Sequence, residues 1–149
     1  MNPTRLALAA LAATLVDGFY GFAVYGNALA GQFLAFPAVF RSSESQMAYL
    51  PAMFAGILIA MFAVTYLYAK GYEGGNGLTE GLRFGAVIAV FNAGYFVGTN
   101  YGILNIGGGL ARSMALAGVG EWLLVGGTIG AIYRPAGAAS LSRKHRSMM

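Results

Sequence analysis

Two long apolar segments in the second half of the chain decide the fold. They are EGLRFGAVIAVFNAGYFVGTNYGIL, residues 80–104, and LARSMALAGVGEWLLVGGTIGAIY, residues 110–133, with a glycine-rich turn between them. Each is longer than the roughly 20 mostly apolar residues that a helix needs to cross the hydrocarbon layer of a membrane. Each also has a polar residue near its middle, Asn92 in the first and Glu121 in the second. A carboxylate halfway along such a helix is costly in lipid, so we expect Glu121 to have a partner inside the protein.

The composition of the whole chain supports the same interpretation. Of its 149 residues, 58% are hydrophobic and only 9% are charged, whereas soluble domains carry about 25% charged residues. Two more apolar segments precede the two above, and the connections are short. The sequence therefore predicts an all-α fold, a single integral membrane domain over residues 1–149. It is a bundle of four transmembrane helices at about 6–28, 47–69, 80–104 and 110–133, followed by a basic cytoplasmic tail at 134–149.

The lysines and arginines predict how this bundle is oriented. In a bundle of four spans the N-terminus, the 70–79 turn and the tail share one side of the membrane. That side would carry seven basic residues and the other side two: Arg5, Lys70, Arg83, Arg134, Arg143, Lys144 and Arg146 against Arg41 and Arg112. Because basic residues gather on the cytoplasmic side, both termini are predicted to lie in the cytoplasm.

The residue types that are missing exclude several kinds of chemistry. The chain has no cysteine, and its one histidine, His145, lies in the basic tail. Disulfides, thiol catalysis, bis-histidine haem and histidine-based zinc sites are therefore excluded. The net charge of +4 is modest and suits lipid headgroups better than nucleic acid. We expect a protein that is not an enzyme, with no cofactor, no metal site and no nucleic-acid partner, and with the lipid bilayer around it.

Three of the four helices place a polar group at a similar depth. At ~1.5 Å per residue, Asp17, Asn92 and Glu121 lie ~18, ~13 and ~19 Å from the basic residue at the cytoplasmic end of their own helix. No cation lies at that depth, and two bare carboxylates would repel each other strongly there. We expect a cluster of these three residues, joined by a shared proton or by hydrogen bonds, with Tyr20 or Tyr95 as a further member. The cluster is either a proton-responsive site or a set of hydrogen bonds that holds the helices in register.

Small residues at four-residue spacing form ridges on three helices. Such ridges let a second helix backbone approach closely. The ridge on the third helix lies roughly 120° around the helix from Asn92, so that helix has two contact surfaces. One can face the first and fourth helices, and the other can face the second helix or another chain. The three ridges are Ala52, Gly56 and Ala60; Gly94, Gly98 and Gly102; and Gly126 and Gly130.

The polar connection at residues 70–79 predicts how the third helix begins. Thr79 is a suitable N-cap, and Glu80 suits the positive end of a helix. Glu80 and Arg83 are three residues apart and can form an interfacial pair. The glycines of this connection supply turns. They lack the trailing Lys-Ser/Thr of a phosphate-binding loop, so no nucleotide site is expected.

The longer connection at residues 30–46 leaves two interpretations open. Phe33, Phe36 and Phe40 recur at helical spacing, which is typical of a short helix lying in the membrane interface. An ordinary loop with aromatic anchors fits equally well. Pro37 is expected to end or bend any helix here, and a serine in the Ser42–Ser45 region can cap the helix that follows.

Two stretches resemble proteins of a known kind. The first runs from YAKGYE at 68–73 through EGLRFG at 80–85, and the second from EWLL at 121–124 through IYRP at 132–135. Together they resemble small, uncharacterised bacterial inner-membrane proteins with four helices. The resemblance implies a multi-pass location in the bacterial inner membrane, and it implies no activity.

Two functions fit these observations. The first is a non-catalytic membrane subunit that packs through its glycine ridges, in a homo-oligomer or with other membrane-protein subunits. The second is a small proton-coupled transporter that uses Asp17 and Glu121. An open cavity at Glu121 would favour the transporter, and a closed core with a large apolar surface would favour the subunit. The sequence identifies no substrate, partner subunit or oligomeric state.

Overall fold

The computed structural model describes residues 1–133, and this part of the chain is all-α. It contains four helical segments long and apolar enough to cross a membrane: Pro3–Ala28, Leu50–Gly71, Gly77–Ile103 and Gly108–Ile132. Their ends lie within three residues of the ends predicted from the sequence. The predicted tail at 134–149, with His145, lies outside the described residues.

Two of the four segments change their helical geometry along their length. The first consists of α1 (Pro3–Ala23) and the π-helical η1 (Val24–Ala28). The third consists of α5 (Gly77–Phe91), the π-helical η2 (Asn92–Val97) and α6 (Gly98–Ile103). The second and fourth are the regular helices α4 (Leu50–Gly71) and α7 (Gly108–Ile132). Two short helices, α2 (Ala30–Leu34) and α3 (Ser43–Met47), connect the first and second segments.

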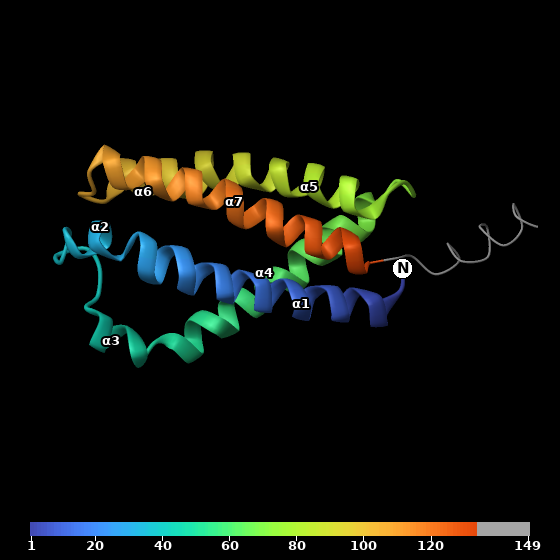
Figure 1. Ribbon diagram of the computed structural model, residues 1–149, viewed down its shortest axis with the longest axis horizontal. Helices are drawn as coiled ribbons and strands as arrows, with labels where there is room; N and C mark the ends of the chain where they lie inside the picture. Colours follow the sequence, from blue (N-terminus) through green and yellow to red (C-terminus); the bar gives the residue numbers. More distant parts are fainter. Residues whose placement is uncertain (134–149) are drawn as a thin grey trace, which may run out of the picture.

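The long helices run along the molecule in an up-and-down arrangement (Figure 1). The N-terminus, the turn between α4 and α5 and the end of α7 gather at one end, and α2 and α3 lie at the other. Helix α7 packs against both α1 and α5, and α4 crosses α1 obliquely. Helices α1 and α7 are therefore the central pair, and their contact brings Asp17 and Glu121 into the same region.

Glycines bring α5 and α7 into direct backbone contact. A Cβ added to any of these glycines would overlap a backbone carbonyl oxygen of the other helix, so no larger residue fits. Gly126 and Gly130 were expected to pack in this way, and their partners are glycines at the same four-residue spacing. The contacts pair Gly77 with Gly130, Gly81 with Gly126, and Gly85 with the Trp122 carbonyl.

The other two ridges are open within residues 1–133. Residues Ala52, Gly56 and Ala60 are exposed on α4. The ridge of Gly94, Gly98 and Gly102 is exposed as well, and no other helix comes within 4 Å of a Cβ built on its glycines. Of the two partners that the sequence left open for this ridge, the helix at 47–69 does not cover it among the described residues, because α4 packs on α1. A contact with another chain stays a prediction.

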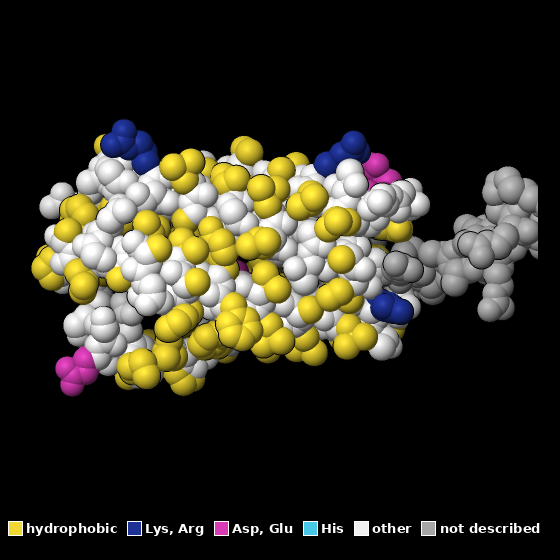
Figure 2. Space-filling model, in the orientation of Figure 1, with side chains coloured by type: hydrophobic (Ala, Val, Ile, Leu, Met, Phe, Trp, Pro, Cys, Tyr) yellow, Lys and Arg dark blue, Asp and Glu magenta, His cyan; other side chains and the backbone are white. Residues whose placement is uncertain are grey.

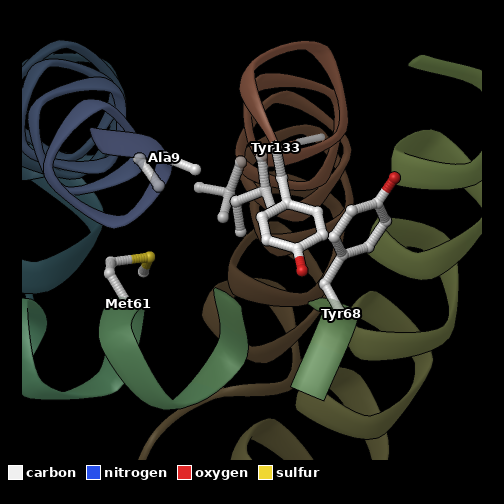
Figure 3. Packing of buried hydrophobic residues seen from close by; sticks show 7 residues of the cluster. Ala9, Met61, Tyr68 and Tyr133 are labelled. Atoms are coloured by element: carbon white, nitrogen blue, oxygen red, sulfur yellow. The ribbon is translucent and has the colours of Figure 1, made fainter. Parts of the chain in front are cut away.

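The main core lies between α1, α4 and α7, near the end that holds the N-terminus. Small side chains on α1, such as Ala9, let Met61 of α4 and the side chains of α7 approach (Figure 3). Tyr68 and Tyr133 pack edge to face, with ring centroids 6.0 Å apart. The Tyr68 hydroxyl also donates to the Gly77 carbonyl oxygen at 3.1 Å, which ties the end of α4 to the start of α5.

The surface between the two ends of the molecule is largely apolar (Figure 2). Large hydrophobic side chains such as Phe19, Ile103 and Leu116 are each about three-quarters exposed. Apart from one acidic side chain in a narrow gap midway along the molecule, the basic and acidic side chains visible on this surface lie near its two ends. An apolar surface of this extent suits lipid better than water.

The start of α5 differs from the sequence prediction. The helix begins at Gly77, and its N-cap is Asn76, whose Oδ1 accepts from the Thr79 backbone N–H at 3.3 Å. The Glu80 carboxylate accepts from the backbone N–H groups of Glu73 and Gly75. Those donors hold Glu80 over the turn, so the expected pair with Arg83 is absent from the described part of the chain.

The connection at 30–46 contains two short helices joined by turns, and of its three phenylalanines only Phe33 lies in a helix. A position in the membrane interface stays a prediction. Helix α2 ends three residues before Pro37, and turns follow. Ser42 accepts from the Ser45 backbone N–H at 3.3 Å and so caps α3, a separate short helix that precedes α4. The rings of Phe33 and Phe40 pack edge to face at 5.0 Å. The phenylalanines cover a second apolar cluster of Val97, Ile106, Leu110 and Ala111.

Candidate functional site

The candidate site lies where the central helices α1 and α7 meet. Asp17 of α1 is 7% exposed, and Glu121 of α7 is partly buried. The two carboxyl groups are direct neighbours. Two acids 104 positions apart in the sequence therefore share one site, as their similar predicted depth suggested.

Two tyrosines from the first segment fix the geometry around Glu121. The Tyr25 hydroxyl donates to Glu121 Oε2 at 2.9 Å. The Tyr20 hydroxyl donates to the Ala117 carbonyl oxygen at 2.7 Å, one turn earlier on α7. The two tyrosine rings pack edge to face, with centroids 6.2 Å apart. Tyr20, predicted as a further member of the cluster, therefore lies beside it, whereas the direct contact comes from Tyr25.

The π-helical turn explains why Tyr25 was not predicted. In η1 the Leu29 backbone N–H donates to the Val24 carbonyl oxygen, five residues back, at 2.8 Å. This wider turn inserts one residue relative to an α-helix and shifts the residues within it around the helix axis. Tyr25 lies within this turn, so its direction does not follow from regular helical spacing. The sequence signal is Asn27, whose side chain donates to the Phe22 carbonyl oxygen at 2.6 Å.

Asn92 reaches the site from η2. Its amide lies over Gly118, where a Cβ would collide with the Asn92 nitrogen. Gly118 and Glu121 are three residues apart on α7 and share a face. Within residues 1–133 the Asn92 side chain makes no hydrogen bond, so its amide is free to bind a ligand.

The structure does not bring Tyr95 to the cluster. Tyr95 is 68% exposed, and its ring stacks on Phe91 with centroids 5.3 Å apart. The cause is again a π-turn, in which the Gly98 backbone N–H donates to the Ala93 carbonyl oxygen. The wider turn carries Tyr95 away and brings Phe96 and Val97 to the side of Asn92.

A pocket of about 270 Å³ opens beside Glu121. It is partly open to the surface, and its wall is mostly apolar. In Figure 2 an acidic side chain is visible in a narrow gap midway along the molecule. The pocket is lined by Tyr25, Phe33, Asn92, Phe96, Val97, Met114 and Glu121.

The site has no cation of its own among the described residues. The basic side chains of residues 1–133 are all exposed. Arg112 lies nine residues before Glu121 on α7, which is ~13 Å along a helix. No basic group contacts Asp17 or Glu121 within this part of the chain. Among residues 1–133, a proton or a cationic ligand can balance the charge of the pair where no basic side chain does.

The described residues contain no group of three or more histidine, cysteine, aspartate or glutamate side chains placed to hold a metal ion. What the site can do is hold a proton between two carboxyl groups, accept hydrogen bonds and carry a negative charge at the edge of a pocket.

Comparisons with known proteins place the chain in no group. No protein-family model matches it, and no curated protein or solved structure matches it. The resemblance to small four-helix proteins of the bacterial inner membrane stays a prediction, and the function proposed below rests on the site.

Proposed function

We propose that this protein is a small proton-coupled transporter of the bacterial inner membrane, with Asp17 and Glu121 as its proton-carrying pair. The observation that carries the proposal is the pocket whose lining includes Glu121. An acid buried only to hold helices in register needs no cavity at its side chain. A transporter needs such a cavity, because its substrate and the proton must reach the same carboxyl group.

Several features support a membrane location. Four helices are long and apolar enough to span a bilayer, and the surface between the ends is apolar. The bias of seven basic residues against two favours cytoplasmic termini. In this orientation the Asp17–Glu121 pair lies near the middle of the membrane, where ionisable groups commonly mark transport pathways.

The coupling would work through competition for Glu121. With no substrate bound, a proton held between the two carboxyl groups offsets their repulsion. Tyr25 donates to Glu121 Oε2 and so holds that carboxyl group in place. A substrate that binds Glu121 favours release of the proton, and rebinding of the proton favours release of the substrate.

The two π-helical segments give the site a means of opening. Residues from η1 and η2 line the pocket from two sides. π-turns interrupt the regular hydrogen-bond ladder of a helix and are frequent at functional sites. Bending at η1 and η2 would change access to Glu121 while the glycine-packed α5–α7 contact stays closed.

Proteoliposomes that contain the full chain and an internal pH dye test the proposal. Amino acids, sugars, organic anions and organic cations are added in turn under an imposed pH gradient. Coupled transport of one class would appear as a substrate-dependent proton flux. The flux should vanish in Asp17→Asn/Glu121→Gln and persist in Glu44→Gln, which neutralises an exposed acid on α3. If no class produces a flux, or if the double variant retains it, the proposal is wrong.

The membrane-subunit function remains a second candidate, and the open ridge of Gly94, Gly98 and Gly102 favours it. Such a ridge is suited to close contact with another transmembrane helix. Gly98→Leu should weaken any oligomer, and Ala86→Leu at an exposed position of α5 should not. The readout is the subunit count in lipid by single-molecule photobleaching. A wild-type chain that stays monomeric would remove the homo-oligomer form of this candidate.

A further inference from the structure

The lining of the pocket identifies a class of ligand. We propose that the pocket binds a small organic cation, an ammonium group on a compact body, between Glu121 and the rings of Tyr25, Phe33 and Phe96. This inference rests on the proposed transport function and names its substrate class.

The charges at the pocket exclude the opposite kind of ligand. Glu121 is the one carboxylate in the lining, and no lysine or arginine lines the pocket. An anion in the pocket would lie beside the Glu121 carboxylate, and no basic side chain in the lining would offset the repulsion between them. A cation supplies the positive charge that the described part of the chain does not place there.

The remaining lining suits a cation with apolar substituents. The three aromatic rings offer negatively polarised faces, which attract ammonium groups, and quaternary ammonium ions are commonly held in aromatic pockets. Met114 adds a polarisable, adaptable wall. A sugar would need many hydrogen-bonding groups, and the lining offers only Tyr25, Asn92 and Glu121.

The geometry adds a specific role for Asn92. Tyr25 already donates its hydroxyl proton to Glu121, whereas the Asn92 amide is free within the described residues. The Asn92 side chain can therefore accept from an N–H group or bind a hydroxyl group of the ligand. At about 270 Å³ the pocket is slightly below the ~300–1,000 Å³ of pockets that hold drug-sized ligands, which restricts the ligand to a small body.

The proton count links binding to coupling. A monovalent cation that binds Glu121 takes the place of one proton in the Asp17–Glu121 pair, and the net charge of the site is unchanged. One proton should be released to solvent for each cation bound. No bond other than that to the proton changes.

A matched pair of probes tests the ligand class by isothermal titration calorimetry on the purified full chain. Choline carries a quaternary nitrogen, and 3,3-dimethylbutan-1-ol has the same shape with a neutral carbon in its place. We expect choline to bind and the alcohol to bind at least tenfold more weakly. Equal binding of the two, or binding of neither choline nor tetramethylammonium to the wild type, would overturn the inference.

Variants locate the binding. Glu121→Gln should weaken choline binding by about thirtyfold or more, because it removes the buried counter-charge. Phe96→Leu keeps an apolar wall but loses one ring and should weaken binding roughly fivefold. Met114→Trp should fill the pocket and block binding, and it tests the site independently if Glu121→Gln fails to fold. Folding of each variant is checked by far-UV circular dichroism. Unchanged binding in folded Met114→Trp would overturn the site, and Glu44→Gln should match the wild type.

The result also separates this inference from the proposed function. Choline-specific binding that depends on Glu121 but releases no proton would support the ligand class and contradict proton coupling. Proton-coupled flux of a sugar or an anion, without choline binding, would overturn the ligand class and support the proposed function.

Discussion

The backbone contact between α5 and α7 gives the sharpest stability prediction, and Gly126→Ala tests it. A Cβ on Gly126 would lie 2.7 Å from Gly85 Cα and 2.8 Å from Gly85 N, whereas ordinary van der Waals contact begins at 3.4 Å. It would also overlap the Gly81 carbonyl oxygen. All three opposing atoms are backbone atoms, so no side chain can rotate away, and the helices must separate.

The expected cost follows from two opposing effects. Overpacking typically costs 1–3 kcal/mol, and this site belongs at the upper end because backbone meets backbone. Against this cost, alanine stabilises a helix by about 1 kcal/mol relative to glycine. The net prediction is a loss of about 2 kcal/mol in the free energy of unfolding.

The assay is unfolding by SDS titration from mild detergent micelles, followed by far-UV circular dichroism and by the fluorescence of Trp122. Trp122 is the single tryptophan of the chain, and its carbonyl oxygen faces Gly85 across the contact. Gly109→Ala is the matched control, because it makes the same change on the same helix where a Cβ meets nothing within 4 Å. The control should be unchanged or slightly more stable. Equal stability of the two variants would refute the backbone contact.

Two smaller changes test other contacts by the same unfolding assay. Tyr25→Phe removes the hydrogen bond to Glu121 Oε2 and should cost about 1 kcal/mol; a neutral result would mean that the tyrosine does not hold Glu121. Asn76→Ala removes the N-cap of α5 and should also cost about 1 kcal/mol. Thr79→Ala should be close to neutral, because only the Thr79 backbone takes part in the cap, and the reverse ranking would restore Thr79 as the cap.

Length and apolar character were enough to predict the four long helices, because a span needs a fixed number of apolar residues. The same reasoning placed Asp17 and Glu121 at similar depths, and the structure brings them together. It could not predict Tyr25 or Phe96 at the site. Regular helical spacing assumes a constant turn, and η1 and η2 break it. Asn27 is visible in the sequence, but its hydrogen bond to the carbonyl oxygen five residues back is a feature of the folded helix.

The glycine ridges show a second limit of the sequence. Gly94, Gly98 and Gly102 have the same spacing as the ridge on α7, yet of these two ridges only the latter is covered by other described residues. Close packing needs small residues on both helices at matching heights, and Gly77, Gly81 and Gly85 supply them for α7. A ridge on one helix therefore indicates the capacity for contact without identifying the partner.

The contact between the central acids is the claim on which the site, the transport proposal and the ligand class all depend. The absence of native cysteine allows a direct test in membranes, with cysteines placed at Asp17 and Glu121 and a short thiol-to-thiol crosslinker. A second pair, at Asp17 and Leu124, is the control, because Leu124 is 52% exposed on α7. The account predicts efficient intramolecular crosslinking of the first pair and little of the second. Efficient crosslinking at Leu124 with none at Glu121 would contradict it.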